Sequence, residues 1–188
     1  MRLIKGHTIA LPWVCALGCA GPTAPPSSPE TSHVTGIEEF FPLSEGLTLT
    51  YQTETHDGVK DMSMVQVHRV HSGLAQMRTG SGVQRLEVTR DSIRKEGGGY
   101  FLRMPLQTGA SWDGENGGTT VVRSTNMTMT VPAGTFKGCV HTEEEVPEQR
   151  ARVTVVYCPG VGIARMKVEQ DGAWKTFELR AYGSKATP

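Results

Sequence analysis

The sequence predicts an all-β domain built as one curved antiparallel sheet or open half-barrel, with a two-sheet β-sandwich as the alternative. Two observations predict this fold. From residue 37 onward, apolar and polar residues repeatedly alternate with a period of two, which is the pattern of half-buried strands. Turn dipeptides separate the alternating runs, and no long window keeps the period of a helix. Many short strands joined locally favour a curved sheet or barrel.

Composition and charge limit the classes of function. The chain has 188 residues, with 19 Lys and Arg against 19 Asp and Glu, so the formal net charge is zero. That length fits one domain or at most two. Without a basic block, affinity for the phosphate backbone of a nucleic acid is not expected. No apolar run reaches the length that a membrane-spanning helix needs.

Residues 1–18 are predicted to be a signal peptide. Arg2 and Lys5 give a basic start without acidic residues, residues 8–18 are a short apolar stretch, and small residues follow it. This order is typical of a secretory signal, and the apolar stretch is too short to cross a bilayer. We therefore expect export from the cytoplasm.

The run Ala16-Leu17-Gly18-Cys19 resembles the lipobox of bacterial lipoproteins, although the larger residue stands second rather than first. The resemblance implies cleavage before Cys19 and acylation of its thiol, which would hold the protein on a membrane without a spanning helix. By analogy with Gram-negative lipoproteins, Ala20 favours the outer membrane. The alternative is ordinary cleavage within residues 16–20, which would release a soluble periplasmic or secreted protein.

Residues 19–36 are predicted to be the lipidated Cys and a disordered linker. Residues 20–36 hold four prolines and six Ser or Thr, with one large aliphatic side chain. Such a composition cannot bury enough apolar surface to fold. At about 3.1 Å per residue, it would form an extended spacer of up to roughly 50 Å. The β domain is expected over residues 37–188, where residues 35–41 read as one short opening helix that Pro42 ends.

A structural disulfide is predicted between Cys139 and Cys158. Both lie in alternating segments that flank residues 147–150. A hairpin that turns there places the two cysteines directly opposite each other, at about 4.5–5.5 Å between Cα atoms, which a disulfide can bridge. The same register pairs Val140 with Tyr157. Of the four cysteines, Cys15 would leave with the signal peptide.

Three dipeptides predict tight hairpins with two-residue loops: Asp57-Gly58, Asn116-Gly117 and Asp171-Gly172. In the last of these, the register pairs Met166 with Phe177 and places apolar side chains on one side.

For Asp57-Gly58, a three-residue loop that pairs Tyr51 with Val65 and Leu49 with Val67 suits the pattern better. Pro159-Gly160 suits the middle of a type II turn.

A short internal repeat joins residues 42–49 and 105–112. Each reads Pro-Leu-x-x-Gly-x-x-apolar and leads into a predicted strand. We expect Gly46 and Gly109 to take a positive φ in a tight turn. Two similar halves of one curved sheet would explain the repeat.

Four methionines are the predicted candidates for a ligand-binding groove. Met62 and Met64 form one i,i+2 pair, and Met127 and Met129 form another. Their flexible side chains suit either adaptable core packing or a plastic apolar groove for a lipid or similar ligand.

No catalytic or metal-binding pattern stands out. His68 and His71 are three positions apart, so on a strand they point to opposite faces and cannot chelate one metal. The nucleophile elbow, the zinc-protease motif, the P-loop and the EF-hand are all missing from the sequence. We expect no metal, no cofactor and no enzymatic activity.

Two segments, Val131 to Cys139 and Tyr157 to Ala164, carry a PAGTF…C…Y…GVG signature. This signature resembles that of an uncharacterised family of bacterial lipoproteins, over about residues 40–188. The resemblance implies an all-β domain akin to the half-barrel folds of lipoprotein carriers, and it implies no activity. The sequence therefore predicts a membrane-anchored envelope lipoprotein whose β domain binds an apolar ligand or a protein partner. A purely structural envelope lipoprotein, without a ligand, is the alternative.

Overall fold

The computed structural model describes residues 36–184, and these residues form one antiparallel sheet of 12 strands. The all-β prediction is therefore confirmed, and the single sheet replaces the sandwich alternative. The strands are β1 (Leu47–Thr55), β2 (Lys60–His71), β3 (Leu74–Thr79), β4 (Gly82–Val88), β5 (Ser92–Lys95), β6 (Tyr100–Arg103), β7 (Ser111–Asp113), β8 (Thr119–Val131), β9 (Gly134–Val146), β10 (Ala151–Cys158), β11 (Gly162–Gln170) and β12 (Ala173–Ser184). Two 3-10 turns accompany them, η1 (Ile37–Glu39) and η2 (Pro147–Gln149).

The predicted signal peptide (residues 1–18), Cys19 and all but the last residue of the predicted linker (residues 19–36) lie outside the described residues. Among the residues that the structure describes, no helix is long and apolar enough to cross a membrane.

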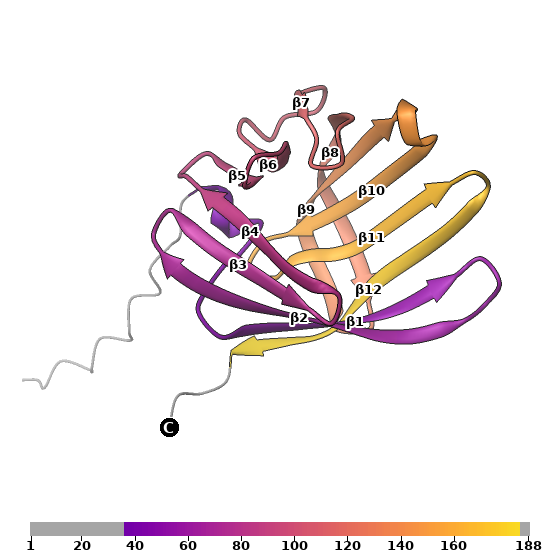
Figure 1. The fold of residues 1–188 in the computed structure, drawn as a ribbon, viewed down its shortest axis with the longest axis horizontal. Helices are drawn as coiled ribbons and strands as arrows, with labels where there is room; N and C mark the ends of the chain where they lie inside the picture. The colour runs from indigo at the N-terminus through magenta and orange to yellow at the C-terminus, as the bar shows by residue number, and fades with distance from the viewer. Residues whose placement is uncertain (1–35, 185–188) are drawn as a thin grey trace, which may run out of the picture. The chain divides into compact units, whose positions relative to one another are not determined.

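The sheet is a meander whose two ends come together. Its order is β6-β5-β4-β3-β2-β1-β12-β11-β10-β9-β8-β7, so the first strand pairs with the last at the centre of the sheet (Figure 1). The edge strands β6 and β7 are neighbours in the chain, and Tyr100 of β6 forms an isolated bridge with Gly114 just after β7. The sheet is thus nearly closed into a barrel.

Glycines allow the two edges to approach. A Cβ atom added to Gly99 would lie 2.0 Å from the carbonyl oxygen of Gly114, a distance that no side chain tolerates. The indole Nε1–H of Trp112 donates to the carbonyl of Tyr100 at 3.3 Å across the same edges. The close glycine contact beside the strands and the hydrogen bond between Trp112 and Tyr100 therefore hold the seam between β6 and β7.

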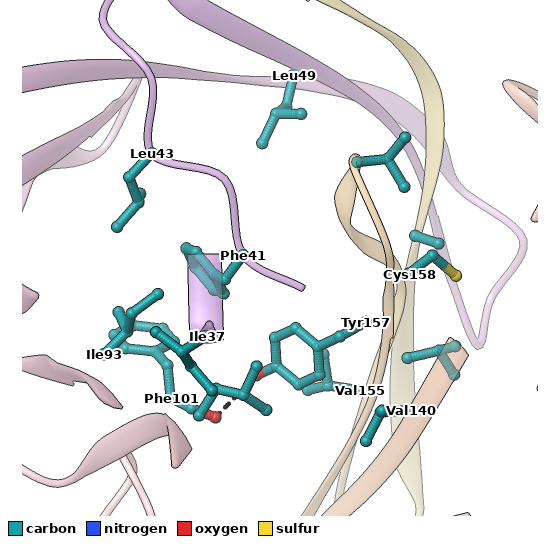
Figure 2. Packing of buried hydrophobic residues seen from close by; sticks show 14 of the residues in the cluster. Ile37, Phe41, Leu43, Leu49, Ile93, Phe101, Val140, Val155, Tyr157 and Cys158 are labelled. Atoms are coloured by element: carbon teal, nitrogen blue, oxygen red, sulfur yellow. Dashed lines mark hydrogen bonds between the residues drawn. The ribbon is translucent and has the colours of Figure 1, made fainter. Parts of the chain in front are cut away.

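The N-terminal segment fills part of the interior. Ile37, Phe41 and Leu43 are each less than 5% exposed and lie among the inner side chains (Figure 2). The guanidinium of Arg69 on β2 holds this segment by donating two hydrogen bonds to Glu38, at 2.9 and 3.1 Å. The short helix expected over residues 35–41 is thus η1. It belongs to the N-terminal segment, residues 37–43, which lies inside the curled sheet and which we call the plug.

Two of the predicted turns are confirmed. Asp171 and Gly172 have φ values of 49° and 85°, as a two-residue type I′ turn requires, and Met166 pairs with Phe177. At Pro159-Gly160, Gly160 has a φ of 75° and the next N–H donates to the carbonyl of Cys158.

The other two hairpins have loops of three residues. At Asp57-Gly58 this is the loop length that suited the pattern, but the pairing expected for it is wrong, and at Asn116-Gly117 the predicted two-residue loop is wrong. Thr55 bonds to Val59, which leaves residues 56–58 as a loop, and Leu49 therefore pairs with Val65 rather than Val67. The loop after β7 is built the same way, between Gly114 and Gly118. In each loop the last residue is a glycine in the left-handed region, which is the usual geometry of a three-residue hairpin.

The internal repeat has a structural counterpart. Gly46 and Gly109 have positive φ values of 75° and 89°, as expected. The N–H of Gly46 donates to the carbonyl of Val67, and that of Gly109 donates to the carbonyl of Val122. Each turn therefore leads into the first strand of a half-sheet, β1 or β7, and ties it to the next strand.

The predicted disulfide is present between Cys139 and Cys158, and both cysteines are fully buried. The hairpin of β9 and β10 has the predicted register, with Val140 opposite Tyr157. The bridge therefore fastens the two strands where the hairpin is furthest from its turn.

Loss of the disulfide should destabilise the domain by about 3 kcal/mol, because the bridge closes a loop with a sequence separation of 19. We expect the double variant Cys139→Ala, Cys158→Ala to show this loss in urea unfolding. A reductant should destabilise the parent protein by a similar amount and leave the double variant unchanged. Equal stability of parent and variant would contradict a stabilising bridge.

Candidate functional site

An apolar cavity of about 270 Å³ lies inside the curled sheet. Its walls come from the plug and from the inner faces of strands on both sides of β1. Apolar side chains make most of its lining, among them Phe41, Leu43, Leu49, Val65, Met77 and Met166. Period-two alternation explains this lining, since every second residue of each strand faces inward.

Two tyrosines place their rings in the interior and donate hydrogen bonds from their hydroxyls to backbone carbonyls. Tyr51, in the cavity wall, donates its hydroxyl to the carbonyl of Ile163 at 3.0 Å. Tyr157 donates to the carbonyl of Phe101 at 3.1 Å. Burial raises the pKa of both hydroxyls, so both stay protonated and act as structural donors.

Glu115 supplies the carboxyl group of the cavity wall. It lies in the loop between β7 and β8 and lines the cavity together with Gln84 of β4. Burial, and after it the negative charge of Glu144, raise the pKa of Glu115 to about 7. The Gln84 side chain and the charge of Lys95 act in the opposite direction. A half-buried carboxyl with a raised pKa in a cavity is a candidate for ligand contact.

Glu144 fixes the loop that carries Glu115. Its buried carboxylate accepts hydrogen bonds from the N–H of Asn116 at 2.9 Å, the side-chain amide of Asn116 at 2.8 Å and the N–H of Gly118 at 3.0 Å. A Cβ atom on Gly114 would lie 2.2 Å from Glu144 Cδ, so the close approach requires glycine there. The loop position of Glu115 is therefore set by three hydrogen bonds to an inward side chain of β9.

The four predicted groove methionines do not line this cavity. Met62 and Met64 are 49% and 52% exposed on the outer side of β2, because the inward positions of that strand are Ser63, Val65 and Val67. Met127 and Met129 lie on β8 and pack against the core. The structure therefore does not gather the four side chains into one groove.

The cavity instead uses two methionines that the sequence analysis did not single out, Met77 on β3 and Met166 on β11. Each stands at an inward position of its strand. Met166 could have been predicted, because the hairpin register at Asp171-Gly172 already pairs it with Phe177 on the apolar side of the sheet. Both side chains line the cavity. Glu115 and Glu144 offered no such signal, since nothing local in the sequence brings the loop to β9.

No histidine of residues 36–184 lines the cavity. His68 contacts Glu45, with Nδ1 at 3.0 Å from Oε1, on the exposed side of β2. Within residues 36–184, no group of three His, Cys, Asp or Glu side chains could hold a metal ion. The described lining of the cavity is mostly apolar and includes one carboxyl group, that of Glu115. Such a lining suits ligand binding.

Comparisons with known proteins give two solved structures of partial similarity. Neither a family model nor a curated protein sequence matches the chain. Among solved structures, it is similar to a protein of Bacteroides fragilis provisionally described as exported and as having a YmcC-like fold, with 14% identity and a TM-score of 0.48 over 77% of this chain and 99% of that one. It is also similar to a provisionally described lipoprotein of Parabacteroides distasonis, with 14% identity and a TM-score of 0.47 over 77% and 98%. At this level of similarity, neither neighbour assigns a ligand or an activity to this chain.

Glu115 should make stability depend on pH. The unfolded chain releases this proton near pH 4.5, whereas the folded protein keeps it to about pH 7. Between these values the folded state binds more protons, so the contribution of Glu115 to stability falls as pH rises and is lost above pH 7. At 1.36 kcal/mol per pH unit, the full change is about 3 kcal/mol.

Urea unfolding of the parent and of Glu115→Gln at pH 4.5 and pH 8 measures this change. Relative to the variant, we expect the parent to lose about 3 kcal/mol of stability between the two pH values. Parallel pH profiles for the two proteins would show that Glu115 titrates normally.

Proposed function

We propose that this protein is a non-catalytic envelope lipoprotein whose β domain binds a small apolar ligand in the interior cavity. The observation that carries the proposal is the apolar lining of a cavity of about 270 Å³. Ligand sites are concave, mostly apolar and equipped with a few polar groups, and typical volumes begin at about 300 Å³. Close packing normally leaves few voids larger than a water molecule in a protein interior. A cavity of this size therefore favours a binding role over a purely structural one.

The lipid anchor belongs to the same proposal. The signal-like residues 1–18 and the lipobox-like run that ends at Cys19 support export and acylation. The Pro-rich residues 20–36 would then separate the domain from the membrane surface. We propose the outer membrane as the site of anchoring, because Ala20 follows the acylated residue.

A protein partner is the second candidate, favoured by the outer face of β2. Met62 and Met64 are about half exposed there, two positions apart on the strand. Adjacent exposed apolar side chains of this kind are typical of contact surfaces. Such a contact would use the face opposite the cavity, so the two functions are compatible.

Labelled palmitate tests the anchor. We expect the parent chain, expressed in a Gram-negative host, to incorporate the label and to fractionate with the outer membrane. Cys19→Ser should abolish incorporation and release the protein from membranes, because the acyl chains supply the membrane affinity. An unlabelled parent chain would favour the soluble alternative.

A cavity-filling substitution tests ligand binding. Val65 lines the cavity, whereas Val83 is 58% exposed on the adjoining part of the sheet. We expect Val65→Trp to weaken binding of octan-1-ol about tenfold or more, because the indole would occupy the site. The matched variant Val83→Trp should bind as the parent does. Calorimetric titration of each folded variant makes the measurement, and equal binding by both variants would place the ligand elsewhere.

A further inference from the structure

We propose that the cavity selects an amphipathic amine, an ammonium group held by Glu115 and carried on a short apolar chain. This inference rests on the proposed function, since it names the class of ligand that the same cavity takes. Two features carry it: the chemistry of the cavity walls, and the way the loop between β7 and β8 presents its carboxyl group.

The walls contain one acidic group and no basic group. Among the lining side chains, all within the part of the chain that the structure describes, Glu115 is the carboxylate, and none is Lys, Arg or His. The remaining polar side chains, such as Ser63 and Gln84, are neutral. A cation on the ligand is therefore the charge that the site complements, whereas a ligand carboxylate would meet a like charge.

The protein offsets the charge of Glu115 only in part, through the Gln84 side chain and the charge of Lys95. The ten ion pairs found among residues 36–184 do not include it. The neighbouring Glu144 is already satisfied by three donors of the loop, so it holds the loop in place and leaves Glu115 for a ligand. A carboxylate placed in advance binds a cation at a lower entropic cost than a mobile one.

The apolar body of the ligand has its own part of the cavity. Gln84, beside Glu115, comes from β4, whereas Met166 and Phe177 come from β11 and β12, on the other side of β1. At about 270 Å³ the cavity lies just below the range of typical ligand pockets, which begins at about 300 Å³, so it suits a short chain. Octylamine, with a short apolar chain and one ammonium group, provides the probe.

Several groups around Glu115 control the pH at which it can pair with an amine. Burial and the charge of Glu144 on β9 raise its pKa to about 7, while Gln84 on β4 and Lys95 on β5 lower it. Tyr157 on β10 also faces it and stays protonated. The carboxylate forms as pH rises through 7, whereas an alkylamine stays charged there. Preference for the amine over a neutral ligand should therefore increase between pH 5.5 and pH 8.

Calorimetric titration with three ligands of matched chain length tests the inference. The protein is the full chain carrying Cys19→Ser, so that no acyl group of its own competes. At pH 8 we expect octylamine to bind about tenfold or more tightly than octan-1-ol, since a hydrogen bond to a charged group adds that much affinity. Octanoate should bind more weakly than the alcohol.

Variants separate the carboxylate from the rest of the cavity. Glu115→Gln should remove the preference for octylamine and leave the affinity for octan-1-ol within about twofold. Glu148→Gln, at an exposed position of η2, is the matched control and should retain the preference. The pH dependence of the amine-to-alcohol ratio in the parent gives a measurement that needs no variant.

The outcomes are distinct. If octan-1-ol binds and octylamine binds no more tightly, or if the ratio does not change with pH, the amine inference fails and the proposed function stands. If octanoate binds most tightly, the amine inference also fails. If neither octan-1-ol nor octylamine binds, both the amine inference and the proposed function fail.

Discussion

The inner face of the curled sheet must be covered, and the plug at residues 37–43 does much of this work. Phe41 lies at the centre of the contact, with its ring centroid 5.7 Å from Phe101 and 5.9 Å from Tyr157 (Figure 2). Phe101 belongs to the half-sheet that ends at β6, and Tyr157 belongs to the other half. Each such aromatic pair adds about 0.5–1.5 kcal/mol beyond its buried area. The plug therefore links the two half-sheets through the interior, and the space it leaves is the cavity.

Closure of the sheet depends on its two edges. Exposed edge strands invite pairing with other chains, and short edges reduce that risk. Here the edges are short, with β6 at four residues and β7 at three. The carbonyls of Tyr100 and Phe101 accept hydrogen bonds from Trp112 and Tyr157, and the loop after β7 is held by Glu144. The loop that presents Glu115 to the cavity therefore also lies at the seam of the sheet.

Local rules explain what the sequence predicted correctly. Alternation identified the strands, and the hairpin register placed Cys139 opposite Cys158, because both depend on residues close in the chain. The register at Asp57-Gly58 and the loop length at Asn116-Gly117 were wrong, since a glycine after Asp or Asn suits the last position of a three-residue loop as well as a two-residue one. A dipeptide alone does not distinguish the two.

Such rules could have predicted one part of the site but not the other. The outward position of Met62 and Met64 was within reach, because Val65 and Val67 have the opposite parity on the same strand. The pair of Glu115 and Glu144 was not, because 28 residues separate Glu144 from the loop residue Asn116 that it binds. Only the near closure of the sheet brings them together. Pairing of neighbouring strands can be predicted from the sequence, but the meeting of the two sheet edges cannot.

Glu115 has no evident role in holding the fold. A buried carboxylate is costly unless it is paired, and the raised pKa of Glu115 is the sign of that cost. Glu144, only 5% exposed, shows how the same fold treats a structural carboxylate, with three hydrogen bonds from one loop. Groups that break a local rule without a structural compensation tend to lie at functional sites. The contrast between these two neighbouring acids therefore points to a ligand, and it favours one that brings the missing positive charge.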